Sequence, residues 1–292
     1  MQLLAIVNPV SGGGRGPAAA ATLHKHLDAH GHDVELRQTR RPGDATRWAA
    51  ETNAECVVTV GGDGTVNEVA NGLALSRAAL AILPVGAVNV VARQLGFKKR
   101  PRTLAERITH GAKRIMDVGL LNGNKRFLLG AGAGLDAAIV HQVHANRAGK
   151  KIGIRSYVVP TARIVLTHIL PKMQVTVDGQ TLSTNAEYVI VGNCRKSVGV
   201  FAGTPEAKVD DGLLDVAVLH DLNPIHVIQL VVGVCRPGFA RREDVTYRQG
   251  AQIEIVAATP EPVPLQVDGD PEGFLPATFT IQHESLTVVG TS

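Results

Sequence analysis

A carboxylate inside a glycine-rich turn is the first feature of this sequence that could do chemistry. An apolar, β-branched run at 56–60 stops at Gly61 and Gly62, and a helical pattern begins at Thr65. Such a turn aims backbone N–H groups and the positive end of a helix at one point, which suits a phosphate. Asp63 lies in this turn, and its carboxylate would repel a phosphate unless a metal ion lies between them or the acid takes part in a reaction.

The same residues also allow a purely structural interpretation. Thr65 and Glu68 have the spacing of a capping box, in which the threonine caps the helix and the glutamate reaches back to it. The glycines would then serve only a tight turn between a strand and a helix. The turn is not a P-loop, because Gly-x-x-x-x-Gly-Lys-Ser/Thr does not occur. Spacing alone leaves phosphate binding and a structural turn both open.

The complete turn, Gly61-Gly62-Asp63-Gly64-Thr65 followed by Asn67-Glu68, resembles the nucleotide-binding signature of the diacylglycerol kinase family. The bacterial soluble lipid kinases of that family are the most similar, and NAD kinases and phosphofructokinases are more distant relatives. The resemblance implies an enzyme that transfers the γ-phosphoryl group of ATP to a lipid hydroxyl with the help of Mg²⁺.

Further stretches resemble the family in the expected order along the chain. The segment 8–12 follows a predicted strand, and Thr39 follows another, where the family's second strand meets adenosine. Residues 84–93 resemble Pro-x-Gly-Thr-x-Asn-Asp-x-Ala-Arg, with Ala87 at the threonine position and Val90 at the second asparagine or aspartate position. One missing hydroxyl would weaken nucleotide binding by about 1 kcal/mol. The resemblance implies a nucleotide site made of Asn8, Ser11, Gly12, Thr39, Gly61, Gly62, Asp63, Gly64, Thr65, Asn67, Gly86, Ala87 and Asn89.

The first part of the chain alternates strands with helices. Strands are expected at 3–7, 33–37, 56–60 and 80–83, and helices near 18–30, 43–53, 65–75 and 103–110. This alternation predicts parallel βαβ units, which bind ligands at the carboxyl ends of their strands. The loops named above all leave such ends, so they can converge on one ligand.

Helices become fewer after residue 118. We expect two of them, at 134–146 and 154–169, among many short strands that begin with an Asp-Gly hairpin at 174–182. The other strands are expected at 188–192, 213–219, 253–256, 265–267, 278–282 and 286–289. Such a pattern predicts an antiparallel sandwich. The fold class is therefore α/β: an N-terminal parallel-sheet nucleotide-binding domain at 1–118, by resemblance similar to NAD kinase and phosphofructokinase, and a C-terminal antiparallel β-sandwich domain for the lipid substrate at 119–292. Residues after about 283 are expected to return to the first domain.

Two acidic segments in the second half could bind a metal ion or accept a proton. Residues 208–215 resemble the family's Asp-Gly-x-x-Asp loop, which implies a structural Mg²⁺ held by the carboxylate of Asp211 and the backbone carbonyls of Lys208 and Leu213. An Asp-Gly turn with solvated acids is the structural alternative.

The second segment, 267–273, stands where the family has Asp-Gly-Glu. By this resemblance Asp270 is the base that takes the proton of the substrate, although Glu272 is a second candidate and a plain hairpin remains the structural alternative. Asp117 matches a family aspartate of the active-site hydrogen-bond network, which would link it with Asp63. We therefore assign Asp270, Asp63 and Asp117 as catalytic.

The composition of the chain disfavours some other classes of function and indicates where the protein acts. The chain has 292 residues, 45% hydrophobic and 3% aromatic, with a net charge of +4. Nucleic-acid binding is disfavoured, because there is no long basic tract and few aromatic residues could stack on bases. Three scattered cysteines predict a reducing, cytoplasmic location. No signal peptide or membrane-spanning run is expected, so a lipid substrate would require contact with a membrane surface, for which the basic cluster at 98–102 is a candidate.

Several alternatives stay open at this point. One is a kinase of the same superfold with a soluble acceptor such as NAD, and another is a non-catalytic nucleotide- or lipid-binding regulator, which Ala87 and the shortened acid Asp270 would fit. The sequence does not name the lipid acceptor, and it leaves a homodimer open.

Overall fold

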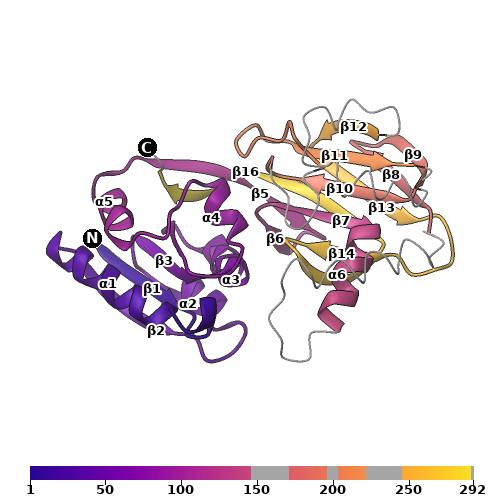
Figure 1. Ribbon diagram of the computed structural model, residues 1–292. Coiled ribbons are helices and arrows are strands. Elements are labelled where there is room, and N and C mark those ends of the chain that lie inside the picture. Colours follow the sequence, from indigo (N-terminus) through magenta and orange to yellow (C-terminus); the bar gives the residue numbers. More distant parts are fainter. Residues whose placement is uncertain (146–170, 196–202, 221, 223–244, 291–292) are drawn as a thin grey trace. The chain divides into compact units, whose positions relative to one another are not determined.

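The computed structural model describes residues 1–145, 171–195, 203–220, 222 and 245–290 (Figure 1). The helix predicted at 154–169 and Cys235 lie outside this part of the chain. The chain divides into two compact units, Met1–Val118 with His283–Ser292, and Gly119–Gln282. Each unit is described by itself below.

The first unit contains a parallel sheet with the strand order β2-β1-β3-β4-β16. Three strands, β1 (Gln2–Val7), β3 (Cys56–Gly61) and β4 (Ala79–Pro84), are buried almost throughout. Continuous apolar runs are typical of parallel strands that are covered on both faces. By contrast, β2 (Asp33–Gln38) is an edge strand and is largely exposed.

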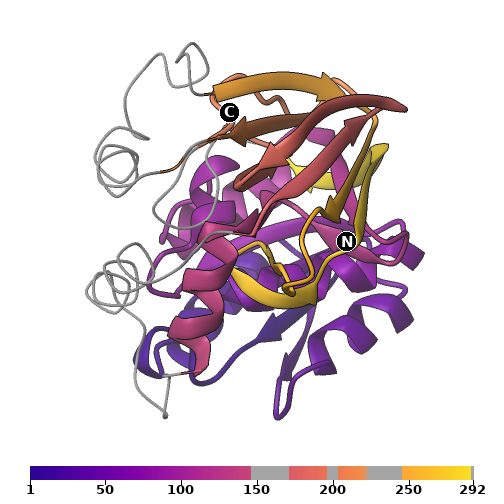
Figure 2. The same ribbon diagram turned by 90° about the vertical axis from the view of Figure 1, so that its right-hand side faces the viewer.

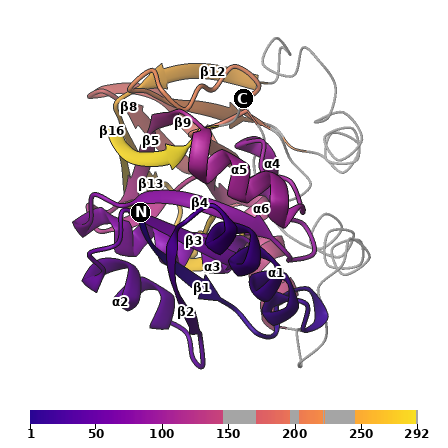
Figure 3. The ribbon, with the colours of Figure 1, turned by 90° about the vertical axis from the view of Figure 1, so that its left-hand side faces the viewer.

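Helices connect these strands. In Figure 3, α1 (Gly16–Ala29) and α2 (Asp44–Glu51) lie on opposite sides of the sheet. The first packs against α5 (Pro101–His110), and the second packs against α3 (Asp63–Gly72). Shorter helical segments are η1 (Ser11–Gly13), η2 (Leu73–Leu75) and α4 (Val90–Gln94).

The second unit is built mainly of antiparallel strands, whose arrows can be followed in Figure 2. One sheet has the order β12-β11-β10-β7-β14-β15. Its strands are β12 (Val245–Gly250), β11 (Leu214–Leu219), β10 (Tyr188–Gly192), β7 (Gly130–Gly134), β14 (Pro264–Val267) and β15 (Asp270–Phe274). The helix α6 (Leu135–Ala145) packs against β7, β14 and β15.

The other strands of this unit continue from β16 to β13, β8 and β9, with β5 and β6 beside β16. Their bounds are β16 (Ala277–Val289), β13 (Gln252–Ala257), β8 (Met173–Val177), β9 (Gln180–Ala186), β5 (Lys113–Leu121) and β6 (Lys125–Phe127). Both β5 and β16 run from one unit into the other: the start of β16 pairs with β13, and its end pairs with β4.

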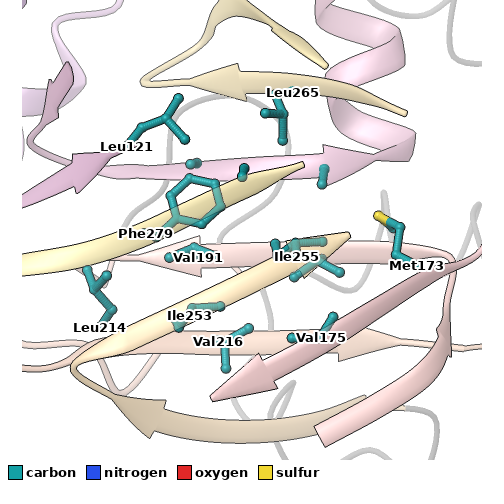
Figure 4. Packing of buried hydrophobic residues seen from close by; sticks show 14 of the residues in the cluster. Leu121, Met173, Val175, Val191, Leu214, Val216, Ile253, Ile255, Leu265 and Phe279 are labelled. Atoms are coloured by element: carbon teal, nitrogen blue, oxygen red, sulfur yellow. The ribbon is translucent and has the colours of Figure 1, made fainter. Parts of the chain in front are cut away.

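The core of the second unit lies between the two sets of strands. In this core, the six-stranded sheet contributes Val191, Val216 and Leu265, which pack against Val175 of β8 and Ile253 of β13 (Figure 4). Alternate residues of each strand point inward, as expected for sheets that pack face to face. The predicted fold class is therefore confirmed.

The structure corrects some of the predicted elements. The runs at 278–282 and 286–289 belong to one strand, β16, and the strand β12 has no counterpart among the predicted strands. The segment Gly130–Gly134 is a fully buried strand although it contains only glycine and alanine. Packing explains this composition, because a Cβ on Gly130 would lie 2.5 Å from the carbonyl oxygen of Val191.

Candidate active site

Three loops of the first unit meet at the carboxyl ends of β1, β3 and β4. The backbone N–H of Asn8 donates to the carbonyl of Val60 at 3.0 Å, and its side-chain Nδ2 donates to Oγ1 of Thr65 at 3.1 Å. The N–H of Val85 donates to the carbonyl of Gly61 at 2.9 Å. Hydrogen bonds therefore join the loop after each strand to the glycine turn at the centre.

Glycine is required where these loops touch. Gly12 has φ +62°, and a Cβ there would lie 1.9 Å from the carbonyl oxygen of Val85. A Cβ on Gly86 would lie 2.6 Å from Cα of Gly62. Both distances are shorter than real Cβ contacts allow, so a side chain at either position would push the loops apart. Gly64 differs, because a Cβ there would meet no atom within 4 Å.

The predicted capping box is wrong. The helix α3 begins at Asp63 rather than Thr65, its N-cap residue is Gly62, and that residue makes no side-chain capping bond. Glu68 Oε2 instead accepts a hydrogen bond from the N–H of Gly43 at 3.1 Å. Glutamate at this position therefore holds the loop before α2, which a pattern of local spacing could not reveal.

Asp63 lies at the first position of α3 and is partly buried. Its Oδ1 accepts a hydrogen bond from the N–H of Val91 at 3.1 Å, in the first turn of α4. Among the described residues, Oδ2 accepts no hydrogen bond. One oxygen of Asp63 thus positions the loop after β4, and the other is available to a ligand.

Asn89 shapes that loop. It has left-handed backbone angles, φ 53° and ψ 56°, and its Nδ2 donates to the carbonyl of Gly86 at 2.6 Å. Within the described residues, the buried Oδ1 atoms of Asn89 and Asn67 have no hydrogen-bond partner. Buried amide oxygens are costly to leave unpaired, so these two atoms fit a ligand that supplies a donor or a cation. Ala87, at the tip of the loop, is exposed.

The other predicted site residues of the first unit are Thr39 and Ser11, which follow β2 and β1, and Asp117, which lies in β5. The N–H of Thr39 donates to the carbonyl of Val7 at 2.9 Å, which places the end of β2 beside that of β1. Ser11 lies in η1, in the first loop. Asp117 is fully buried in β5, and its Oδ1 accepts hydrogen bonds from Nδ1 of His283 and the N–H of Glu284, both at 2.8 Å. These bonds fasten β5 to β16; a role in an active-site network stays a prediction.

In the second unit, Asp270 follows a tight turn between β14 and β15. Asp268 and Gly269 form this turn, with φ 51° and φ 89°. The side chain of Asp270 is 55% exposed, and its Oδ1 lies 3.9 Å from Nε2 of His144 on α6. Glu272, on the same strand, pairs with Lys125 at 2.8 Å. Both acids therefore have a basic side chain nearby, and the choice of Asp270 over Glu272 as the base stays a prediction.

Buried polar residues hold this turn, and the sequence did not point to them. The carboxylate of Asp268 accepts hydrogen bonds from the N–H groups of Leu128, Leu129 and Gly130, at 2.8, 2.8 and 3.0 Å. Gln266 links Gly269 to α6: its Oε1 accepts the N–H of Gly269 at 2.9 Å, and its Nε2 donates to Asp136 at 3.0 Å. The Asp-Gly pair signalled only a turn.

Asp136 is an unusual acid. Burial raises the pKa of its carboxyl to about 7, against the hydrogen bonds from Gln266 and Tyr188, which lower it. The space for this carboxyl exists because residue 132 is a glycine, since a Cβ there would lie 2.4 Å from Oδ1 of Asp136. The carboxyl of Asp136, with its pKa near neutral pH, is thus connected through the side chain of Gln266 to the turn that precedes Asp270.

Two family models together match nearly the whole chain. The diacylglycerol kinase catalytic domain matches residues 2–121, and the YegS C-terminal NAD kinase β-sandwich-like domain matches residues 130–290. The chain belongs to the diacylglycerol kinase family.

Individual relatives agree with this. The diacylglycerol kinase of Bacillus subtilis (strain 168) is 26% identical over 291 residues, covering 97% of this chain and 94% of that protein. The diacylglycerol kinase of Staphylococcus saprophyticus is 25% identical and covers 97% and 93%. A crystal structure of a diacylglycerol kinase from Bacillus anthracis str. Sterne superimposes with a TM-score of 0.76 at 26% identity, covering 99% of this chain and 97% of that one. A second structure from that organism reaches 0.83 at 28% identity, covering 99% and 95%.

In this diacylglycerol kinase family member, the candidate Mg²⁺ loop has a surplus of negative charge. Oδ1 of Asp211 accepts the N–H of Leu213 at 3.2 Å, and Gly212 adopts φ 72°. Asp215 is buried, and its carboxylate accepts hydrogen bonds from Tyr247 and Gln249. Burial raises the pKa of Asp215; the two hydrogen bonds oppose this, and the charges of Asp211 and Glu206 raise it further.

A carboxylate and carbonyl oxygens near other acids suit a hard cation, so the residues present fit Mg²⁺. The predicted ligands would be the carboxylate of Asp211 and the carbonyls of Lys208 and Leu213. The described residues contain no group of three or more His, Cys, Asp or Glu side chains arranged to bind a metal ion. A magnesium site here would therefore depend on backbone oxygens, as the family resemblance implies.

Proposed function

We propose that this protein is a lipid kinase that transfers the γ-phosphoryl group of ATP to a hydroxyl of diacylglycerol or a similar long-chain alcohol. The observation that carries the proposal is the convergence of the loops after β1, β3 and β4 around the turn Gly61–Thr65, with open space at Gly64. The family supports kinase chemistry. The nucleotide and the acceptor are our inference.

The glycine turn would hold the phosphates. The first N–H groups of a helix have no partner within it. In α3 the N–H groups of Thr65 and Val66 donate to the carbonyl of Gly62 at 3.1 Å, which would leave those of Asp63 and Gly64 for a phosphate. Positive helix ends favour anions, and glycine lets the backbone approach them closely. Asn8, Ser11, Gly12, Thr39, Gly86 and Asn89 would complete the nucleotide site, and the exposed Ala87 would contribute no hydroxyl.

A general base would then act on the acceptor. An alcohol is a weak nucleophile. Its oxygen would bond to the γ-phosphorus of ATP while the bond to the leaving ADP breaks, and a carboxylate that takes the hydroxyl proton accelerates such a step by about 10²–10⁴-fold. Asp270 suits this role, because its side chain is half exposed while the turn that carries it is fixed by Asp268 and Gln266. Bound Mg²⁺ would supply positive charge to the phosphate oxygens.

The acceptor would be met at a membrane surface. Among the described residues, no helix has the length and apolar character needed to cross a bilayer.

Paired substitutions test the base. Asp270→Asn should reduce transfer of radiolabelled phosphate to a lipid extract by at least about 100-fold, with ATP binding retained, because only proton transfer is lost. Glu272→Gln removes the same charge from the same strand and serves as the control, with an expected loss below about 10-fold. A fully active Asp270→Asn variant would refute the assignment of the base.

A separate experiment tests the acceptor. The protein is incubated with labelled ATP and either a bacterial lipid extract or NAD, and the products are identified by mass spectrometry. A labelled lipid supports the proposal. Label on NAD alone would show a kinase with a soluble acceptor, and ATP binding without any product would indicate a non-catalytic regulator.

A further inference from the structure

A positively charged pocket lies where β2 ends and α2 begins. Its volume is about 510 Å³, within the range of small-molecule sites. The chain between these elements turns sharply, with Gly43 at φ 87°. The pocket is lined by Arg37, Gln38, Arg40, Arg41, Asp44, Arg47 and Trp48. None of the lining residues is assigned to the nucleotide or to catalysis, but Thr39, which is assigned to the nucleotide, stands between Gln38 and Arg40 in the sequence, so the pocket adjoins the candidate nucleotide site.

Asp44 fixes the loop that carries two of the arginines. It is buried, and its Oδ2 accepts hydrogen bonds from the N–H groups of Arg40 and Arg41 at 2.9 and 3.1 Å. The bond from the Arg40 backbone is the main cause that lowers the pKa of Asp44. Its contacts with the guanidinium groups of Arg41 and Arg47 are longer, 3.5 and 3.4 Å. The carboxylate of Asp44 thus mainly accepts hydrogen bonds from the backbone, and the guanidinium groups of Arg41 and Arg47 remain accessible to a ligand.

Trp48 orients the other two arginines. The guanidinium carbon of Arg37 lies 5.9 Å from the centre of an indole ring of Trp48, and that of Arg47 lies 6.0 Å away. Such cation–π contacts restrict long side chains that are otherwise free to move. The side chains of Arg37, Arg41 and Arg47 are 37%, 76% and 50% exposed, so their charged ends reach solvent.

The charge of the pocket defines the ligand. Four guanidinium groups line it, and the carboxylates of Asp44 and of Glu35, which pairs with Arg37 at 2.6 Å, offset two of them. Four minus two leaves two positive charges. Planar guanidinium groups bind phosphate oxygens through paired hydrogen bonds, and a phosphomonoester at neutral pH carries nearly two negative charges. The lining has one aromatic and no aliphatic side chain, so it does not suit an acyl chain.

We propose that this pocket is a second anion site, which binds the phosphate group of a phosphomonoester. Free phosphate and the headgroup of a phosphorylated lipid share this chemistry. The proposal does not depend on kinase activity, because the pocket is built entirely from residues 37–48.

Trp48 is the only tryptophan of the chain and therefore reports on the pocket directly. The full-length protein is titrated with glycerol 3-phosphate while tryptophan fluorescence is recorded, and glycerol and sodium chloride at matched ionic strength serve as reference titrations. We expect a saturable change with glycerol 3-phosphate only. A change that follows ionic strength alone would overturn the proposal.

Variants locate the binding. The double variant Arg40→Gln/Arg41→Gln leaves the two arginines beside Trp48 in place and should weaken binding at least about tenfold, because two charge-assisted hydrogen-bond donors to the phosphate are lost. Arg102→Gln removes an exposed arginine of α5 and is the matched control, with unchanged affinity expected. Calorimetric titration gives affinities that do not rely on fluorescence. Equal affinity in the double variant and in the control would refute the assignment.

Further titrations show whether free phosphate or a lipid headgroup supplies the bound phosphate group. Inorganic phosphate, ATP, and phosphatidylcholine vesicles with and without phosphatidate are each added to the same protein. A saturable response to phosphate or to phosphatidate vesicles supports the proposal, and the tighter of the two identifies the source. A response to ATP alone would show that the pocket belongs to the nucleotide site and would overturn the proposal.

Discussion

Asp268→Ala should destabilise the second unit strongly, because three backbone N–H groups depend on this carboxylate. Oδ2 accepts the N–H of Leu128, and Oδ1 accepts those of Leu129 and Gly130. The bonds are 2.8–3.0 Å long, and Asp268 is 5% exposed. Each buried N–H left without a partner costs about 1–3 kcal/mol, so the loss of all three bonds should lower the unfolding free energy by about 3–9 kcal/mol.

Asp268→Asn should cost less, for a geometric reason. The amide oxygen can still accept the two N–H groups at the Oδ1 position, while its nitrogen faces the N–H of Leu128. One lost bond and one donor–donor contact should cost about 1–3 kcal/mol. The series alanine, asparagine, aspartate should therefore rise in stability in that order.

Urea unfolding followed by far-UV circular dichroism measures these differences, with the exposed Glu261→Gln as the control. Amide hydrogen exchange at 128–130 provides a local measurement, and these amides should exchange much faster in Asp268→Ala. If the alanine variant unfolds within about 0.5 kcal/mol of the wild type and keeps slow exchange there, the carboxylate does not stabilise this turn.

The remaining predictions concern pH and the glycine turn. Burial in the folded protein raises the pKa of Asp136 from its ordinary value of 3.8 to about 7. Between these values the folded state binds more protons than the unfolded state, so this group makes stability fall as pH rises from about 4 to 7. Asp136→Asn should remove that dependence, and urea unfolding at several pH values measures it; an unchanged pH profile would contradict the burial argument. Gly64→Ala should keep or raise stability, by up to about 1 kcal/mol, because its Cβ meets nothing within 4 Å and alanine favours helix. It should nevertheless weaken ATP binding, because the Cβ projects where the phosphates are proposed. Gly86→Ala should lose about 1–3 kcal/mol of stability, because its Cβ would lie 2.6 Å from Cα of Gly62. Thermal unfolding and ATP titration of both variants test the pair, and equal ATP affinity in Gly64→Ala and the wild type would place the phosphates elsewhere.

Local patterns were sufficient for much of the fold. Buried strands such as β3 and β4 are continuous apolar runs, and the hairpin of β8 and β9 has the expected Asp-Gly turn, with Asp178 at φ 47° and Gly179 at φ 76°. The carboxyl ends of parallel strands lie at one edge of the sheet, which is why the loops after β1, β3 and β4 could be expected to meet.

Features that depend on distant partners could not be predicted. The strand β7 contains only glycine and alanine, and its composition follows from contacts with residues about 60 positions away, such as Val191. Asp268 and Glu68 bind backbone groups of other segments, so their neighbours in sequence give no sign of their roles. For the candidate site, the structure supplies the contacts among the loops, while the nucleotide, the metal ion and the base stay predictions.

The path of β16 has a consequence for how the chain folds during synthesis. Val288 pairs with Leu80, so the parallel sheet of the first unit receives its last strand from the far end of the polypeptide. Until those residues have left the ribosome, one side of β4 has no neighbouring strand, and the buried carboxylate of Asp117 has neither His283 nor Glu284 to accept from. A truncated protein that ends at Gln282 keeps all of the second unit, and proteases should therefore cleave its first unit more readily than that of the wild type.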